Sequence, residues 1–98
     1  MPRFLIERDI EGAGRFSPEE RQAISARSNE VLDQMQSEGH HIQWDHSYVT
    51  ENAINCVYVA SGPDVIREHA RRGGFPCTDI REIATLIDPV TGESPVRA

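Results

Sequence analysis

Hydrophobic and polar residues follow two different periods along this chain, and the period predicts the element in each segment. Residues 3–10 place Phe4 and Ile6 on one face of an extended segment and Leu5 on the other, which predicts a strand with both faces covered. Residues 80–87 have the same two-sided apolar character and predict a last strand that ends at an Asp-Pro pair. Strands of this kind need a covering layer on each side of their sheet.

A β-hairpin is predicted in the middle of the chain. Segments 41–49 and 53–60 alternate or run apolar with aromatic and β-branched members, which is typical of strands, and turn-forming residues at 50–52 separate them. The length of the reversal decides which side chains share a face, and the sequence leaves that length open.

Two helices are predicted, one before the hairpin and one after it. Residues 17–20, Ser-Pro-Glu-Glu, have the order of a capping box with proline at the first helical position, and Gly39 ends this helix. The second helix begins at Pro63, after a glycine, and runs to Arg72 before a pair of glycines. The positions expected to face inward are Ile24, Val31, Leu32 and Met35 in the first helix, and Val65, Ile66, His69 and Ala70 in the second.

The predicted order is strand, helix, strand, strand, helix, strand. This order is typical of the ferredoxin-like βαββαβ fold, an α+β class with a four-stranded antiparallel sheet and two helices on one face. We expect one such domain over residues 1–90 and a flexible C-terminal tail over 91–98. Because three strands are apolar on both faces, a second copy is expected to cover the helix-free face, giving a homodimer of the dimeric α/β-barrel type.

Charge and composition exclude several partners. The formal net charge is −6, and all ten basic residues are arginines, so no basic stripe is available for nucleic acid. No segment approaches the roughly 20 apolar residues of a membrane-spanning helix, and the start of the chain runs directly into a strand pattern. The sequence therefore predicts a cytoplasmic protein without membrane or nucleic-acid partners. Its two cysteines have neither redox nor zinc-ribbon spacing.

Four side chains near the hairpin are candidate metal ligands. Cys56 on the second hairpin strand and His69 on the following helix are the soft and borderline donors that late first-row divalent metals prefer. His46 and Tyr48 are further candidates. A two- or four-residue reversal would pair Ser47 with Cys56 and turn His46 and Tyr48 to the opposite face, whereas a three-residue reversal would pair Tyr48 with Cys56 and bring His46 to the same side.

Other chemically active residues have weaker support. Glu7 and Asp9 share a face of the first strand and could offer oxygen ligands or a general base, although pairing with nearby arginines is the simpler expectation. His40 and His41 follow the glycine that ends the first helix and are expected on the surface. Cys77 follows a proline in a loop and is expected to be a partly exposed thiol.

Several short motifs occur in a fixed order. They are FLIERDI at 4–10, WDHSYV at 44–49, CVYVA at 56–60, REHA at 67–70, GFP at 74–76 and IDP at 87–89. In this order and spacing they resemble the small ferredoxin-like nickel-binding proteins of bacteria, a family long described as a domain of unknown function. The resemblance implies a dimeric ferredoxin-like fold and nickel binding at Cys56 and His69, and it does not extend to Cys77 or the His40-His41 pair.

Three functions remain open at this point. The first is a homodimer that binds nickel, with zinc, cobalt or copper as other possible metals, and that buffers, sequesters or delivers the ion. The second is a small-molecule pocket enzyme of the cofactor-independent oxygenase or isomerase type, supported by fold analogy alone. The third is an interaction module. No catalytic triad, phosphate loop or paired catalytic carboxylate is evident, so no catalytic residue is predicted.

Overall fold

The computed structural model of this chain describes residues 1–93. Its elements, in order, are β1 (Arg3–Asp9), the 3₁₀ turn η1 (Ala13–Arg15), α1 (Pro18–Ser37), β2 (Ile42–Val49), β3 (Ala53–Ala60), α2 (Pro63–Gly73), β4 (Asp79–Ile83) and α3 (Pro89–Glu93). The ferredoxin-like βαββαβ prediction is confirmed. Within residues 1–93 no helix combines the length and the apolar character needed to cross a membrane.

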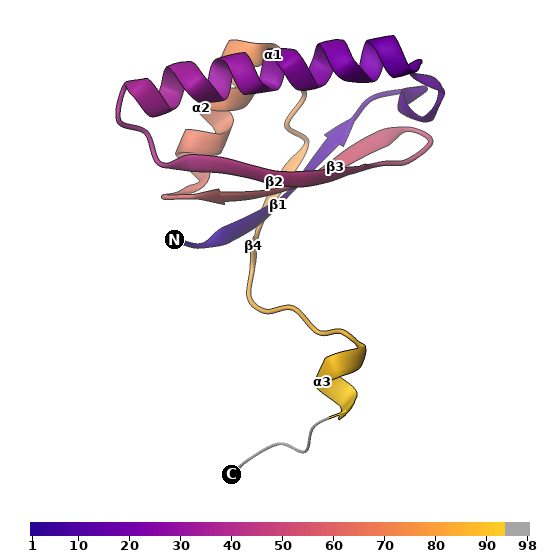
Figure 1. The fold of residues 1–98 in the computed structure, drawn as a ribbon, viewed down its shortest axis with the longest axis vertical. Helices are drawn as coiled ribbons and strands as arrows, with labels where there is room; N and C mark the ends of the chain where they lie inside the picture. Colours follow the sequence, from indigo (N-terminus) through magenta and orange to yellow (C-terminus); the bar gives the residue numbers. More distant parts are fainter. Residues whose placement is uncertain (94–98) are drawn as a thin grey trace.

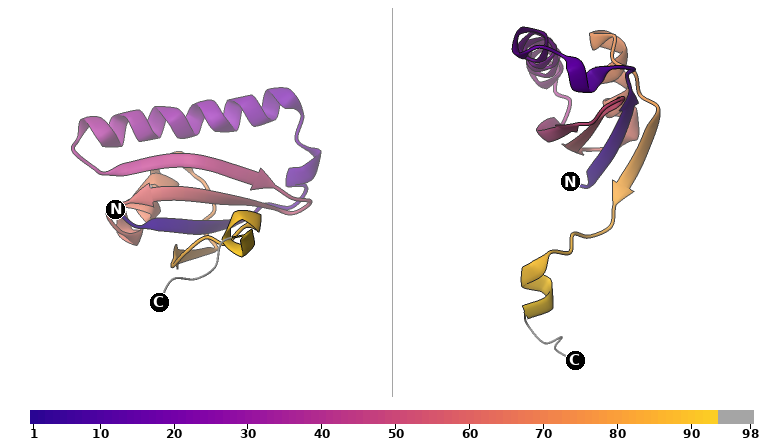
Figure 2. Two further views of the ribbon diagram at one scale, coloured as in Figure 1. Left: turned by 60° about the horizontal axis from the view of Figure 1, so that its bottom comes forward. Right: turned by 90° about the vertical axis from the view of Figure 1, so that its right-hand side faces the viewer.

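The sheet has the order β2-β3-β1-β4, with every neighbouring pair antiparallel. Helices α1 and α2 cover one face of this sheet, and no helix of residues 1–93 covers the other face (Figure 1 and Figure 2). The buried core lies between the sheet and the two helices. The short helix α3 stands apart from this body on an extended segment (Figure 2).

Local capping fixes both ends of α1. The Ser17 side chain accepts a hydrogen bond from the Glu20 backbone N–H at 3.1 Å, and the Glu20 carboxylate accepts from the Ser17 N–H at 3.0 Å. Pro18 occupies the first helical position, where its missing N–H costs nothing. At the other end Gly39 takes a left-handed φ of 94°, which reverses the chain into β2. The predicted helix start and stop are confirmed.

Strand β1 alternates strictly between the two faces of the sheet. Phe4 and Ile6 are buried under the helices, and Leu5 is exposed on the helix-free face, as predicted. The same alternation places Arg8 on the helix-covered side, where only 4% of its surface is exposed. The expectation that this arginine pairs with the acidic residues of β1 is wrong, since those carboxylates lie on the opposite face.

Strand β4 is shorter than predicted. It ends at Ile83, which pairs with Arg3, the first residue of β1. Beyond that point β1 offers no backbone to continue the antiparallel ladder, so residues 84–88 leave the sheet despite their apolar sequence. Helix α3 reaches residue 93, within the segment predicted to be a flexible tail, and residues 94–98 of that prediction lie outside the described part of the chain.

Arg72 joins the two helices that cover the sheet. Its guanidinium donates to Glu38 at the end of α1 at 2.8 and 3.0 Å, and to Glu68 within α2 at 2.7 Å. Arg71 also donates to Glu68, and these two arginines lower the pKa of that carboxyl to about 2. This side chain therefore bridges α2 to the end of α1, although its sequence position at the end of the second helix also suits a residue that faces water.

Candidate functional site

The hairpin register separates the predicted metal ligands into two groups. The Thr50 N–H donates to the Ala53 carbonyl at 2.9 Å, which closes a two-residue reversal. This register pairs Ser47 with Cys56, one of the two outcomes left open by the sequence. Cys56 faces the helices, and His46 and Tyr48 face the opposite side.

His69 is a buried, neutral imidazole. It lies on the inner face of α2 with no exposed surface, and its Nε2 is 3.2 Å from the Ser28 hydroxyl of α1. Burial, reinforced by the charge of Arg8, lowers the pKa of His69 to about 4. Its Nδ1 atom has no hydrogen-bond partner within residues 1–93. The rings of Tyr58 and Phe75 lie 5.4 and 5.5 Å from the imidazole, centroid to centroid.

His46 and Tyr48 form the second pair, on the helix-free face. Their rings meet edge to face at 5.2 Å, and 63% of Tyr48 is exposed. The four predicted ligands therefore lie two on each side of the sheet. In the part of the chain that the structure describes, no three His, Cys, Asp or Glu side chains come together as a possible metal site.

The remaining acidic and thiol candidates lie elsewhere. Glu7 and Asp9 are exposed on the helix-free face, and a hydrogen bond and repulsion from Asp9 raise the pKa of Glu7. Cys77 is half-buried against the core. His40 and His41 lie after α1, with His41 exposed and His40 half-buried near Glu38, at 3.8 Å.

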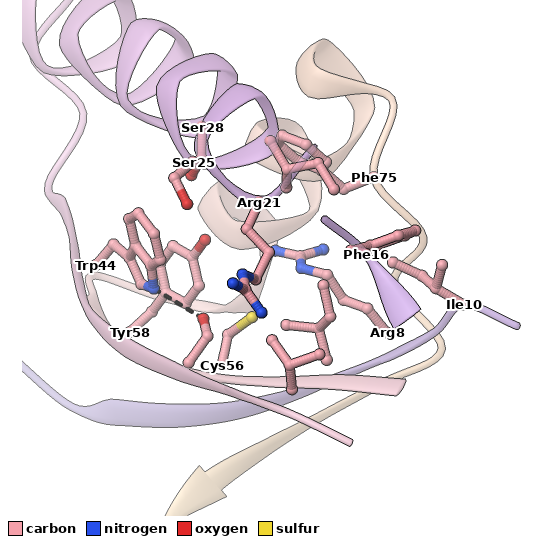
Figure 3. A pocket seen from close by; sticks show the side chains of 14 residues that line it. Arg8, Ile10, Phe16, Arg21, Ser25, Ser28, Trp44, Cys56, Tyr58 and Phe75 are labelled. Carbon is pink, nitrogen blue, oxygen red and sulfur yellow. Dashed lines mark hydrogen bonds between the residues drawn. The ribbon is translucent and has the colours of Figure 1, made fainter. Parts of the chain in front are cut away.

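A cavity of about 180 Å³ lies between α1 and the helix-covered face of the sheet (Figure 3). Its walls are mostly aromatic and aliphatic, and Cys56 and Tyr58 of β3 contribute to its lining. His69 does not line it. Trp44 forms one wall, and its indole N–H donates to the Ser47 hydroxyl at 2.9 Å.

A bulge in β2 creates the Trp44 wall. Asp45 is an extra residue between Trp44, which pairs with Tyr58, and His46, which pairs with Val57. Residues three apart face opposite sides of a regular strand, so the extra residue is what brings Trp44 and Ser47 to the same side. The Asp45 carboxylate lies 3.6 Å from the Arg3 guanidinium.

Arg8 is the chemically unusual residue of the cavity, and the sequence reasoning missed it. One guanidinium nitrogen donates to the Pro76 carbonyl at 2.7 Å, and the buried Nη2 has no partner within residues 1–93. The guanidinium carbon lies 5.9 Å from the Tyr58 ring centroid and 5.5 Å from that of Phe75. The strict alternation Phe4, Ile6, Arg8 was the signal that could have placed this arginine in the interior.

The cavity does not match either arrangement expected from the sequence. A metal site needs Cys56 and His69 together, but only Cys56 lines the cavity. A pocket enzyme with Glu7 or Asp9 as its general base would need one of these carboxylates in the cavity, and neither faces the helices. The lining instead combines apolar walls with the positive charges of Arg8 and Arg21.

Comparison with known proteins gives two matches. A family model described as "Nickel responsive protein SCO4226-like" matches residues 4–83. The crystal structure of SCO4226 from Streptomyces coelicolor A3(2) is similar in fold, with a TM-score of 0.70 at 10% sequence identity. The similarity covers 87% of this chain and 99% of that one. No curated protein matches the sequence significantly.

Proposed function

The chain belongs to the SCO4226-like family of nickel-responsive proteins, and from this membership we propose that it is a cytoplasmic homodimer that binds nickel. In this role it buffers, sequesters or delivers the ion. The match over residues 4–83 is the observation that carries the proposal, because it spans every strand of the sheet.

Within residues 1–93 of a single subunit, no cluster of donors forms a nickel site. Cys56 and His69 are buried on the helix-covered side beside the Arg8 guanidinium, whose charge repels a cation. His46 and Tyr48 are exposed on the other face, where His46 offers the imidazole that suits nickel. We therefore place the nickel ion on the helix-free face, where donors from a second copy would complete its ligand set.

Carboxylates on the same face support this placement. Pairing across the sheet puts Tyr48, Asn55, Glu7 and Asp79 in one row. A hydrogen bond and repulsion from Asp9, on the same face, raise the pKa of Glu7, with a smaller contribution from Asp79, and a bound divalent cation would relieve that repulsion. Oxygen donors from this row and imidazoles from two subunits would together make a mixed ligand set.

Exposed apolar side chains support the proposed homodimer. Leu5 lies at the centre of the helix-free face, is 41% exposed, and pairs with half-buried Val57. Leu86 and Ile87, on the segment that leads to α3, and Val90 of α3 are also exposed. A second copy packed on this face would cover apolar side chains from both regions.

Substitution at the two histidines tests the placement of nickel. Calorimetric titration of the metal-free protein should show nickel binding that His46→Ala weakens by about tenfold or more, since a ligand is lost. His69→Ala should weaken it far less, and His41→Ala, which removes an exposed histidine outside the sheet, serves as the control. If His69→Ala and Cys56→Ser abolish binding and His46→Ala does not, the metal lies on the helix-covered side. A wild-type protein that binds no nickel overturns the proposal.

The dimer has a separate test. Leu5→Arg should convert a dimer of the 11.0 kDa chain into a monomer in light scattering, because it buries a charge in the interface without disturbing the subunit core. Gln22→Arg adds the same charge on the exposed side of α1 and should leave the dimer intact. A wild-type protein that is monomeric at micromolar concentration removes the dimer from the proposal.

A further inference from the structure

The cavity under α1 has a charge opposite to that of the protein as a whole. The chain carries a formal net charge of −6, yet Arg8 and Arg21 line the cavity and no acidic side chain of residues 1–93 does. We propose that this cavity binds a small organic anion, a monocarboxylate with an apolar body, whose carboxylate pairs with Arg8 and Arg21. The site is separate from the nickel-binding face and does not depend on it.

Arg8 supplies the first and stronger argument. A charged side chain that is almost completely buried normally has a carboxylate or several hydrogen-bond acceptors around it. Arg8 has the Pro76 carbonyl on one nitrogen, and its buried Nη2 has no partner among the described residues. This nitrogen is a fixed donor in a water-poor environment, which an anion in the cavity would satisfy.

The packing around Arg8 keeps its guanidinium in place. The rings of Tyr58 and Phe75 lie within cation–π distance of it, and its Nη1 donates a hydrogen bond to the Pro76 carbonyl. A donor held in this way loses little conformational entropy when it binds a ligand. The arrangement is that of a prepared anion site.

Arg21 adds a second positive charge from α1. Six arginines in the described part of the chain have carboxylate partners: Arg3, Arg27, Arg67, Arg71, Arg72 and Arg81. Neither Arg8 nor Arg21 pairs with a carboxylate of residues 1–93, and both line the cavity. Figure 3 shows the two side chains entering the cavity from different elements, with their guanidinium groups near its centre.

The remaining walls decide what kind of anion fits. Phe16, Ile24, Trp44 and Ile54 offer apolar contact, which a simple inorganic anion would not use. The volume of about 180 Å³ is below the roughly 300 Å³ at which pockets for drug-sized ligands begin, so the ligand is small. A planar aromatic or short branched carboxylic acid satisfies both the charge and the walls.

Benzoate is a suitable probe, and benzamide is its neutral counterpart of nearly the same shape. Titration of the full chain, followed by the fluorescence of Trp44 and by amide chemical shifts, should show saturable benzoate binding and binding of benzamide that is weaker by about tenfold or more. Inorganic phosphate should not compete at equal concentration, because it gains nothing from the apolar walls.

Arginine variants locate the binding. Arg21 is an exposed residue of α1, so Arg21→Gln should keep the fold and weaken benzoate binding about tenfold. Arg8→Lys should weaken it further, because lysine keeps the charge but loses the planar pair of donors. Arg15→Gln is the matched control, since Arg15 is exposed, has no carboxylate partner among the described residues and does not line the cavity.

Three outcomes would overturn the proposal. Equal affinities for benzoate and benzamide would show that the arginines do not select an anion. Phosphate binding as tight as benzoate binding would show a site for any anion. Failure of benzoate to shift Trp44 fluorescence or any amide signal would show that the cavity binds no organic acid of this size.

Discussion

Acid should destabilise this protein through His69 before its carboxylates protonate. The pKa of the folded imidazole is about 4, against an ordinary histidine value of 6.5, because the ring is buried beside Arg8. Below pH 6.5 the unfolded chain takes up a proton that the folded chain does not, so the free energy of unfolding falls as pH falls. A difference of about 2.5 pH units at about 1.4 kcal/mol each gives a total loss of about 3.5 kcal/mol, complete near pH 4.

The loss is large for a domain of this size. A chain of 98 residues is expected to have an unfolding free energy of about 5 to 15 kcal/mol, so this single group controls a substantial part of it. Glu68, whose pKa is about 2, loses its own contribution only below the ordinary carboxyl range near 4.5. Measurements between pH 7.5 and 4.5 therefore separate the imidazole from this carboxylate.

The assay is urea unfolding followed by Trp44 fluorescence, in a chelator, at constant ionic strength and constant protomer concentration. The wild-type unfolding free energy should fall by about 2 to 3 kcal/mol over this range. His69→Gln keeps a hydrogen-bonding group toward Ser28 but cannot titrate, so its pH dependence should be flatter by that amount. The exposed His41→Gln should keep the wild-type slope. Parallel curves for wild type and His69→Gln would refute the reasoning.

Three further predictions concern the fold. Ser17→Ala removes the α1 cap and should cost about 1 kcal/mol of unfolding free energy, measured by urea denaturation; no change would mean that the capping box contributes nothing in solution. Gly74→Ala should cost about 1 kcal/mol by the same assay, because a φ of 72° disfavours any residue with a Cβ, even though an added Cβ would meet no atom within 4 Å. A stabilised variant would contradict this backbone conformation. Ile6→Ala should cost about 2 to 5 kcal/mol, whereas Leu5→Ala on the opposite face should cost far less in a monomeric background; equal costs would contradict the facing of β1.

Local signals were sufficient for most of the secondary structure. The capping box at Ser17 and the glycines after each helix fix helix ends through contacts only a few residues apart, so the sequence predicts them well. The fold class follows from the order of elements, which is confirmed. The last strand was predicted too long because its end depends on where β1 begins, at Arg3, a fact about pairing partners far apart in sequence.

The candidate site was less predictable because it depends on pairing between segments. Arg8 was considered only among the arginines that could pair with Glu7 and Asp9, although strand alternation carries it into the interior, where no carboxylate of residues 1–93 meets it. The cavity itself exists only where α1 crosses the sheet, and neither Arg21 nor Trp44 has a sequence signal for lining it. Which residues line the cavity is therefore decided only by the packed structure.

The hairpin shows most clearly what the sequence alone determined and what it did not. Strand propensity and turn residues established two strands, and in a regular β2 the residues Ile42, Trp44, His46 and Tyr48 would all share one face. The structure turns the first two toward the helices, with Ile42 buried and Trp44 half-buried, and exposes the last two on the other side. The two-residue reversal sets the pairing register of β2 next to the turn, and packing of Ile42 and Trp44 toward the helices sets which face the start of β2 presents. The extra residue Asp45 makes these two requirements compatible. The sequence supplied the strands, and packing against the helices decided which face each candidate ligand occupies.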